Sequence, residues 1–143
     1  MNNHQNHWNY LQKAYAQKRM PQAMLFAGQT HSILENLVLP LSKLLLCQLR
    51  KDEACGVCAD CLMVAREEHP DMQWVKAEKK NGPIKIDQIR QLQQEAYLTP
   101  QRALYRVILI ENADKMNTAA ANALLKILEE PSKHTIFILL AQQ

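Results

Sequence analysis

Apolar residues along the chain fall into short continuous runs, separated by longer segments in which they recur every three or four positions. Four runs have strand length, and they occupy residues 23–28, 72–77, 106–111 and 135–141. Three of them, AMLFAG, RVILIE and TIFILLA, are apolar at most positions. Such runs are typical of strands that are buried on both faces. The pattern therefore predicts four strands, of which these three are buried.

The segments between the runs have the repeat of amphipathic helices. They predict helices over residues 4–18, 31–48, 88–97 and 118–130, and a shorter one that ends near Glu68. Asp87 and Asn117 precede two of these helices and have side chains suited to N-capping. Pro40 should kink the helix over 31–48 or mark its true start. The expected inward residues of the last helix are Ala121, Leu124, Leu125 and Leu128.

Strand and helix patterns alternate along the chain, which predicts an α/β fold with a parallel sheet flanked by helices. A length of 143 residues fits one compact domain. The chain stops two residues after its last predicted strand, and parallel α/β domains seldom end so abruptly. We therefore expect a fragment that is truncated before the last strand of its sheet.

Composition and charge narrow the classes of function. Seventeen basic and fourteen acidic residues give a net charge of +3, whereas a dedicated nucleic-acid binder usually has a stronger, clustered excess. Residues 76–106 carry seven basic and three acidic residues, and we interpret them as a solvated face in preference to a DNA-binding patch. No apolar run reaches the roughly 18 residues of a membrane span, and the polar N-terminus lacks the apolar block of a signal peptide. The expected location is cytoplasmic.

The cysteines of the chain are spaced as metal ligands, with a C-x2-C-x2-C core and a fourth cysteine upstream. They are Cys47, Cys55, Cys58 and Cys61. Four thiolates satisfy tetrahedral zinc, with bonds of about 2.3 Å, and Gly56 supplies the backbone freedom that such a turn needs. The alternatives are two disulfides, which suit secreted chains, or four free thiols. Zinc held by four sulfurs has no open position, so it would be structural. We interpret the nearby His69 as a surface or turn residue, not as a substitute ligand.

The loop after the first predicted strand has the position of a phosphate-binding loop without its residues. A working loop reads G-x-x-x-x-G-K-[ST], with backbone N–H groups around the phosphates, a lysine for their charge and a hydroxyl for Mg²⁺. From Gly28 the same frame reads GQTHSILE. Ile33 replaces the second glycine, Leu34 the lysine and Glu35 the hydroxyl residue. A branched side chain would crowd the phosphates, the cation is missing and a carboxylate would repel them, so we expect no bound ATP.

The end of the third predicted strand is altered as well. In an ATPase site this strand ends in Asp-Glu, a metal ligand followed by the base that activates water. Here VILIENAD ends in Glu111 and Asn112. A glutamate could still reach a metal, but an asparagine cannot act as the base. The residues alone leave a second interpretation open, in which these are ordinary strand ends of an α/β domain unrelated to nucleotides.

Several longer segments together resemble a known family. They are RVILIENADKMNTAAANALLKILEEPSKHTIFILLA at 106–141, LLC at 45–47 followed by C-x2-C-x2-C, HPD at 69–71, and IKIDQIRQL at 84–92. In type and order they resemble segments of the clamp-loader subunits of bacterial DNA polymerase III. The likeness extends over residues 21–141, which is most of the chain.

This resemblance implies an AAA+ ATPase-like domain over residues 1–143, with a zinc-binding insertion at 47–61. The last strand, a helical lid, a C-terminal collar and a Ser-Arg-Cys motif that reaches a neighbour's ATP would be missing. Tau and gamma subunits of the family keep both nucleotide motifs, and delta-prime subunits have lost them, so the altered loop places the chain with the delta-prime kind. Such a chain is not an enzyme by itself. Within the DNA polymerase III holoenzyme it would hold partner ATPase subunits, gamma or tau and delta, which load the sliding clamp on primed DNA.

Two other functions stay open at this stage. One is an active ATPase of the tau or gamma type with an unusual loop, and the other is a zinc-dependent DNA-binding module built on the same core. A candidate partner interface is the exposed side of the helix over 118–130, which carries Asn122, Lys126, Glu129 and Glu130. The leucines of this helix are most simply explained as core residues. The expectation that its exposed side faces a neighbouring subunit therefore comes from the resemblance.

Overall fold

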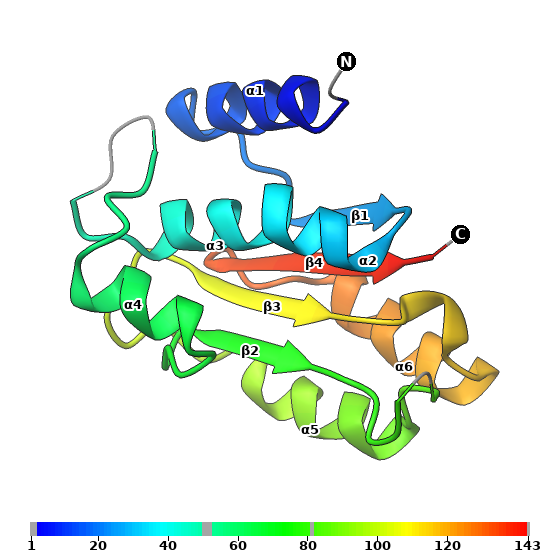
Figure 1. The fold of residues 1–143 in the computed structure, drawn as a ribbon. Helices are drawn as coiled ribbons and strands as arrows, with labels where there is room; N and C mark the ends of the chain where they lie inside the picture. Colours follow the sequence, from blue (N-terminus) through cyan, green and yellow to red (C-terminus); the bar gives the residue numbers. More distant parts are fainter. Residues whose placement is uncertain (1–2, 50–52, 81, 143) are drawn as a thin grey trace.

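The computed structural model describes residues 3–49, 53–80 and 82–142, which form a sheet with helices on both faces (Figure 1). The strands are β1 (Ala23–Ala27), β2 (Met72–Val75), β3 (Arg106–Ile110) and β4 (Thr135–Ala141). The α-helices are α1 (Asn3–Ala16), α2 (Thr30–Ile33), α3 (Leu39–Leu46), α4 (Ala59–Ala65), α5 (Ile86–Glu95) and α6 (Thr118–Glu129). A π-helical turn (Leu34–Val38) joins α2 to α3, and a 3-10 turn (Ala113–Lys115) follows β3. The predicted alternation of strands and helices is confirmed.

The strands pair in the order β1-β4-β3-β2, and every pair among the described residues is parallel. β3 and β4 lie inside the sheet and are buried along almost their whole length, as their continuous apolar runs predicted. The carboxyl ends of parallel strands meet at one edge, which is where open α/β sheets bind ligands. The segments that follow β1 and β3, with the two altered nucleotide motifs, therefore lie at the same edge.

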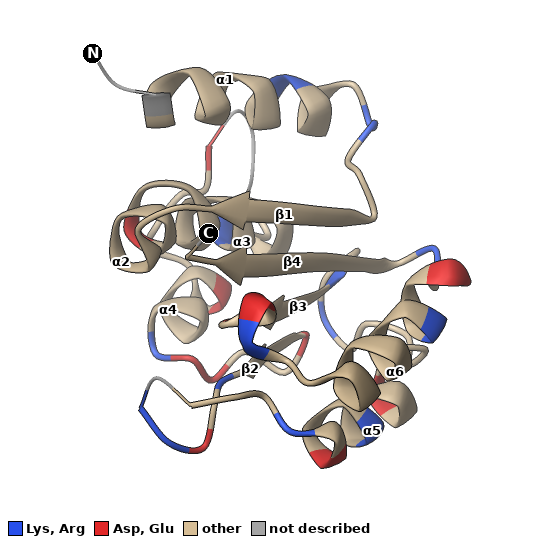
Figure 2. Ribbon diagram, turned by 90° about the vertical axis from the view of Figure 1, so that its right-hand side faces the viewer, with Lys and Arg blue, Asp and Glu red and all other residues tan. Residues whose placement is uncertain are grey.

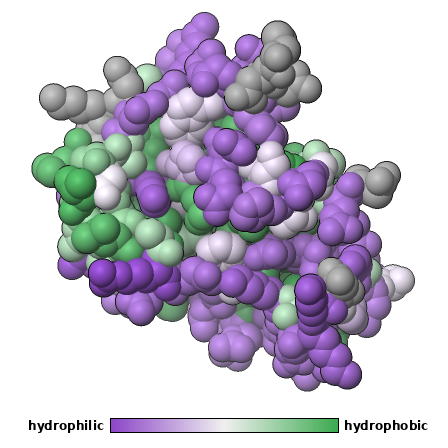
Figure 3. Space-filling model, viewed as in Figure 1, coloured by the Kyte–Doolittle hydropathy of each residue, from purple (hydrophilic) through white to green (hydrophobic). Residues whose placement is uncertain are grey.

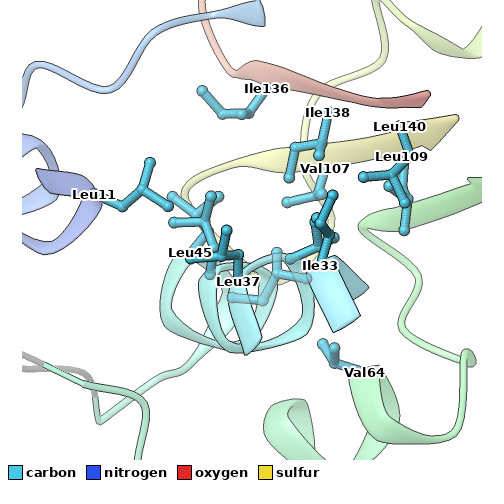
Figure 4. Packing of buried hydrophobic residues seen from close by; sticks show 13 residues of the cluster. Leu11, Ile33, Leu37, Leu45, Val64, Val107, Leu109, Ile136, Ile138 and Leu140 are labelled. Carbon is cyan, nitrogen blue, oxygen red and sulfur yellow. The ribbon is translucent and has the colours of Figure 1, made fainter. Parts of the chain in front are cut away.

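Alternate residues of the interior strands supply a core on each face of the sheet. One core packs the sheet against α1 to α4 (Figure 4), and its residues include Leu11, Ile33, Leu37, Leu45, Val64, Val107, Leu109, Ile136, Ile138 and Leu140. The other packs the opposite face against α5 and α6, and its residues include Ile89, Leu92, Ile108, Ile110, Ala120, Leu124, Ile127 and Phe137. The structure is therefore a three-layer arrangement in which both sides of β3 and β4 are covered.

The position of β1 differs from the prediction of a buried strand. β1 is an edge strand, and its residues alternate between half-buried and exposed. Leu25, at its centre, is 64% exposed. An apolar run identifies a strand, but the order of strands in the sheet decides which of them lies at an edge.

Pro40 is accommodated by a change of helix type. The N–H of Leu39 bonds to the carbonyl of Leu34, five residues back, which is the step of a π-helix. Pro40 then lies in the first turn of α3, where its missing N–H costs little. The chain thus runs from α2 to α3 as one interrupted helix, with the interruption just before the proline.

One of the two predicted helix caps is correct. The side chain of Asn117 accepts the N–H of Ala120 at 2.8 Å and begins α6. The prediction for Asp87 is wrong, because α5 begins at Ile86 with Lys85 as its N-cap residue. The N–H of Lys85 donates to the side chain of Gln88 at 2.9 Å. Asp87 lies in the first turn of the helix, where a carboxylate interacts favourably with the helix dipole.

Charged side chains surround the sheet. Both signs are interspersed on the helices and loops (Figure 2). None of the helices within the described ranges combines the length and the apolar character needed to cross a membrane.

Candidate metal centre and nucleotide-binding loop

The four cysteines converge at the junction of α3 and α4. Cys47 directly follows α3, Cys58 is the N-cap residue of α4, and Cys61 lies in the first turn of that helix. Their sulfur atoms and that of Cys55 all lie within 4.8 Å of one another. Residues 50–52 of the predicted insertion lie outside the described ranges. The surface around α4 is largely apolar in Figure 3, and Leu62 is among its exposed residues.

The sulfur separations fit tetrahedral zinc. Sγ of Cys47 lies 3.6 Å from Sγ of Cys55 and 3.8 Å from Sγ of Cys58, and Sγ of Cys55 lies 4.0 Å from Sγ of Cys61. Bonds of about 2.3 Å to a common ion would place tetrahedral ligands about 3.8 Å apart. Disulfide sulfurs would be only about 2.05 Å apart, and all four cysteines are free thiols. The structure therefore contains neither of the alternative disulfides, and its donor set matches zinc.

Backbone N–H groups point at these sulfurs. The N–H of Cys55 donates to Sγ of Cys47 at 3.4 Å. The N–H of Cys58 donates to Sγ of Cys55 at 3.2 Å, and the N–H of Cys61 donates to Sγ of Cys58 at 3.4 Å. Gly56, at the turn, has a φ of 77°, which glycine adopts without steric cost. Hydrogen bonds of this kind favour the thiolate form, which is the form that binds a metal.

The thiols also affect one another's ionisation. Burial raises the pKa of Cys58, but the N–H groups of Cys61 and Gln48 and hydrogen bonds from neighbouring thiols lower it to about 6. Burial, together with the thiols of Cys58 and Cys47, raises the pKa of Cys61 to about 12. One thiolate in the cluster therefore opposes the ionisation of the next. A divalent cation would remove this repulsion and hold all four thiolates together.

His69 lies beside the cysteine cluster but does not belong to it. Its side chain is buried, and Nε2 lies 2.7 Å from Oδ1 of Asp60. The N–H of Asp71 donates to Nδ1 at 2.9 Å, so the proton of the ring resides on Nε2. Of the two interpretations, a surface residue is wrong, because Asp60 inside the cysteine motif supplies a buried partner, and a turn residue is right, because the N–H of Met72 donates to the carbonyl of His69 at 3.1 Å. Sequence analysis did not single out Asp60, although its place between two predicted ligands was a signal.

The altered nucleotide loop is short, because α2 begins two residues after Gly28. The side chain of Gln29 accepts the N–H of Ser32 at 2.6 Å and caps this helix. Gly28 has a φ of 144°, and a Cβ added to it would lie 3.2 Å from Cδ1 of Ile33. The residue in place of the second glycine thus covers the first one. Phosphate binding needs backbone N–H groups that are open to the ligand, and here the N–H of Gly28 donates to the carbonyl of Ala141 and that of Ser32 to the side chain of Gln29.

The next two replaced residues have other surroundings. Leu34 is half-buried and packs against the core between the sheet and α3. Glu35 is exposed and lines a cavity of about 420 Å³ together with Lys43 and Glu53. Gly28 lines a different cavity. We expected the Glu35 carboxylate beside the phosphate position, and the structure directs it toward the cysteine segment instead.

At the end of β3, the carboxylate of Glu111 accepts a hydrogen bond from the indole Nε1–H of Trp74 in β2. β4 separates β1 from β3, so Glu111 lies about 10 Å from the β1 end and bonds away from it. Asn112 follows with a φ of 56° and a ψ of 40°, a left-handed conformation that asparagine tolerates. Sequence analysis missed Trp74, because the contact depends on the pairing of β2 with β3.

A cavity of about 650 Å³ opens beside the loop, between α1, β1 and α2. Its lining is mainly apolar and includes Leu11, Met24, Phe26 and Ile33. Among the described residues that line it, none is lysine or arginine. The described lining therefore lacks the lysine that neutralises the phosphates in a working loop. Local sequence patterns did not predict it, because it depends on how α1 sits against β1.

Helix α6 exposes the four candidate interface residues, as the sequence predicted. They are Asn122, Lys126, Glu129 and Glu130. Leu125 is 54% exposed, which contradicts its assignment to the core. Ala120, Leu124 and Ile127 form the buried stripe instead, and Leu125 lies one helical step of about 100° away from Leu124. The exposed side of α6 thus combines charged residues with a leucine.

Comparison with known proteins gives consistent matches. The family model described as DNA polymerase III, delta subunit, matches residues 3–143. The chain is 43% identical over 90 residues to DNA polymerase III subunit delta' of Pseudomonas aeruginosa, a match that covers 63% of this chain and 27% of that protein. It is 33% identical over 130 residues to DNA polymerase III subunit tau of Bacillus subtilis, which covers 90% of this chain and 23% of that protein. The chain thus spans about a quarter of the length of these curated relatives.

A solved structure has the same fold. It is described as a DNA polymerase III gamma subunit-related protein from Thermotoga maritima, and it superposes with a TM-score of 0.62 at 20% sequence identity. The superposition covers 94% of this chain and 39% of that one. At this identity the likeness shows the arrangement of sheet and helices.

Proposed function

Because the chain belongs to the DNA polymerase III delta-subunit family, we propose that it is a clamp-loader subunit of the delta-prime type. In this role it binds no nucleotide and catalyses no reaction by itself. Its AAA+ domain holds the partner ATPase subunits, gamma or tau and delta, while they load the sliding clamp on primed DNA during replication. The chain contributes to the assembly by forming buried interfaces with its partner subunits and by its rigidity. It works in the cytoplasm, where bacterial DNA is copied.

The observation that carries this proposal is the contact of Ile33 with Gly28. Cδ1 of Ile33 lies 3.2 Å from the place of a Cβ on Gly28, and the N–H of Gly28 already donates to the carbonyl of Ala141 at 3.0 Å, so this glycine offers a phosphate no free N–H. The carboxylate of Glu111 supports the same conclusion, because it is engaged by Trp74 on the side away from β1. A site without its cation, with N–H groups of its loop already bonded and its acid engaged elsewhere, does not suit ATP hydrolysis.

Isothermal calorimetry with ATP and Mg²⁺ tests the proposal. We expect no heat above background at millimolar nucleotide, while a clamp-loader ATPase with an intact loop binds under the same conditions. The similarity to the tau subunit over 90% of the chain favours the alternative of an active ATPase. Micromolar binding of ATP would establish that alternative and overturn the proposed function.

We further propose that Cys47, Cys55, Cys58 and Cys61 hold one structural zinc. The matching sulfur separations and the N–H groups directed at the sulfurs support it. The ion would cross-link the end of α3 to the start of α4 and would have no open position for substrate. The zinc-binding insertion at 47–61 would then be a structural module of the AAA+ domain.

A further inference from the structure

A buried carboxylate lies at the centre of a polar network beside the cysteines. Asp60 in α4 is 1% exposed and is placed between two cysteines of the cluster. Its Oδ1 lies 2.7 Å from Nε2 of His69 and accepts from Nε of Arg102 at 3.0 Å. Its Oδ2 accepts from a terminal guanidinium nitrogen of Arg102 at 3.2 Å. Because a buried charge without partners is costly, these contacts fix the start of α4 and the two cysteines next to Asp60.

Asp71 organises the segment that presents the arginine. This carboxylate is fully buried and accepts the backbone N–H groups of Gln101, Arg102 and Ala103 at 2.5, 2.7 and 2.8 Å. The N–H of Asp71 donates to His69, whose other ring nitrogen contacts Asp60. The HPD sequence at 69–71 thus connects the segment before β3 to the first turn of α4.

Arg102 contacts both chain segments that carry the cysteines. Its guanidinium binds Asp60, which lies between Cys58 and Cys61. Its backbone carbonyl accepts from Nε2 of Gln48 at 3.4 Å, and Gln48 directly follows Cys47. A zinc ion would connect the same two segments from the inside.

We propose that Arg102, held in place by Asp71 and His69, positions the two cysteine-bearing segments for zinc, and that zinc in turn orders residues 101–103. This inference rests on the zinc proposed above. The network brings the ligand segments together before the metal arrives, so less order has to be gained on binding. Outer partners that orient metal ligands typically change metal affinity by about 10–100-fold, and Arg102 acts here as such a positioning residue, without contact to the ion.

The substitution Arg102→Gln tests the inference in the full chain. It removes the charged fork and keeps a polar side chain. We expect zinc to transfer to a chromophoric chelator about tenfold faster than from the native chain, and Arg102→Lys, which keeps the charge but loses the paired donors, to give an intermediate rate. Arg90→Gln is the matched control, because the ion pair that Arg90 forms among the described residues is with exposed Asp87 on α5, at 3.6 Å, and it should release zinc at the native rate.

The zinc content of the purified native chain is measured first, because it tests the zinc site separately from the positioning role of Arg102. A native chain that purifies without zinc would overturn the metal site itself. A native chain with one zinc, together with a folded Arg102→Gln chain that releases zinc at the native rate, would overturn only the positioning role.

Hydrogen exchange on the native chain gives a second readout that needs no variant. We expect removal of zinc to accelerate exchange of the amides of Gln101, Arg102 and Ala103 about tenfold, while the amide of Leu109, inside the sheet, keeps its rate. Unchanged exchange at these three amides after zinc removal would contradict the proposed coupling.

Discussion

Single side chains decide what the loop after β1 can bind. In the function that we propose Ile33 is the decisive one, because its side chain packs beside Gly28, where a functional loop has a second glycine. We propose that Glu111 is unavailable to a nucleotide for a different reason, because its carboxylate accepts a hydrogen bond from Trp74. The two changes follow different strands, β1 and β3, so we expect that reversing either one alone would not restore a working site.

Asp71 provides a test at the scale of one residue. Burial raises the pKa of Asp71, but the N–H groups of Gln101, Ala103 and Arg102 lower it by a larger amount. The pKa of Asp71 therefore lies below its ordinary value. A carboxyl group whose pKa is lower in the folded chain than in the unfolded chain stabilises the fold at any pH above its unfolded-state value of about 3.9. This stability is lost as the pH falls through the pKa of the folded state. We expect Asp71→Asn to reduce the free energy of unfolding by about 1–3 kcal/mol at pH 7.

Urea unfolding from pH 7 down to pH 2.5 measures this effect. The difference between the native chain and Asp71→Asn should be largest at neutral pH and should shrink below about pH 4. Asp87→Asn is the control, because Asp87 is exposed on α5 and its interactions with Arg90 and the helix dipole are screened by water, so it should change the free energy of unfolding by less than about 1 kcal/mol. A loss for Asp71→Asn that is the same at every pH would show that the charge of Asp71 does not stabilise the fold.

Helix α6 presents two different sides at the scale of one element. Its buried stripe of Ala120, Leu124 and Ile127 fixes it on the sheet. Its other side exposes charged residues and Leu125. Protein interfaces combine an apolar centre with a polar rim, and Leu125 with the charged residues around it has that composition. This side of α6 is therefore the surface that we expect to face a partner subunit.

The substitution Lys126→Glu tests that surface. Reversing a charge at an interface places like charges opposite each other, so we expect the Kd for the cognate gamma or tau subunit to rise about tenfold, which is about 1.4 kcal/mol. A pull-down followed by titration measures it. Lys13→Glu, at an exposed position of α1 on the other side of the sheet, should bind like the native chain. Undiminished binding of Lys126→Glu would exclude this side of α6.

Elements with strong local signals were predicted with their bounds. β4 agrees at both ends, and α6 begins where the Asn117 cap placed it. The start of α5 was not predicted, because the N–H of Lys85 bonds to the side chain of Gln88, which lies further along the chain. The exposure of Leu25 was not predicted either, since strand order is a property of the whole sheet. Local patterns thus defined the elements, and their pairing defined which faces are buried.

At the scale of the whole molecule, the two candidate sites lie on the same face of the sheet, at opposite ends of its strands. The altered loop lies at the carboxyl ends of the strands, and the cysteine cluster lies toward their amino ends, at the other end of α3 (Figure 1). Residue spacing was sufficient to find the cysteines. It could not find Arg102 as a partner of Asp60, because 42 residues separate them and only the packed fold brings them together.

The central claim is that the loop after β1, at the place of a nucleotide-binding loop, does not bind nucleotide in this chain. A crystal structure of the chain grown with a nonhydrolysable ATP analogue and Mg²⁺ at millimolar concentration tests it most directly. We predict that Ile33 still covers Gly28 and that the loop carries no nucleotide. Ordered density for three phosphates against Gly28, with Ile33 displaced, would contradict the account.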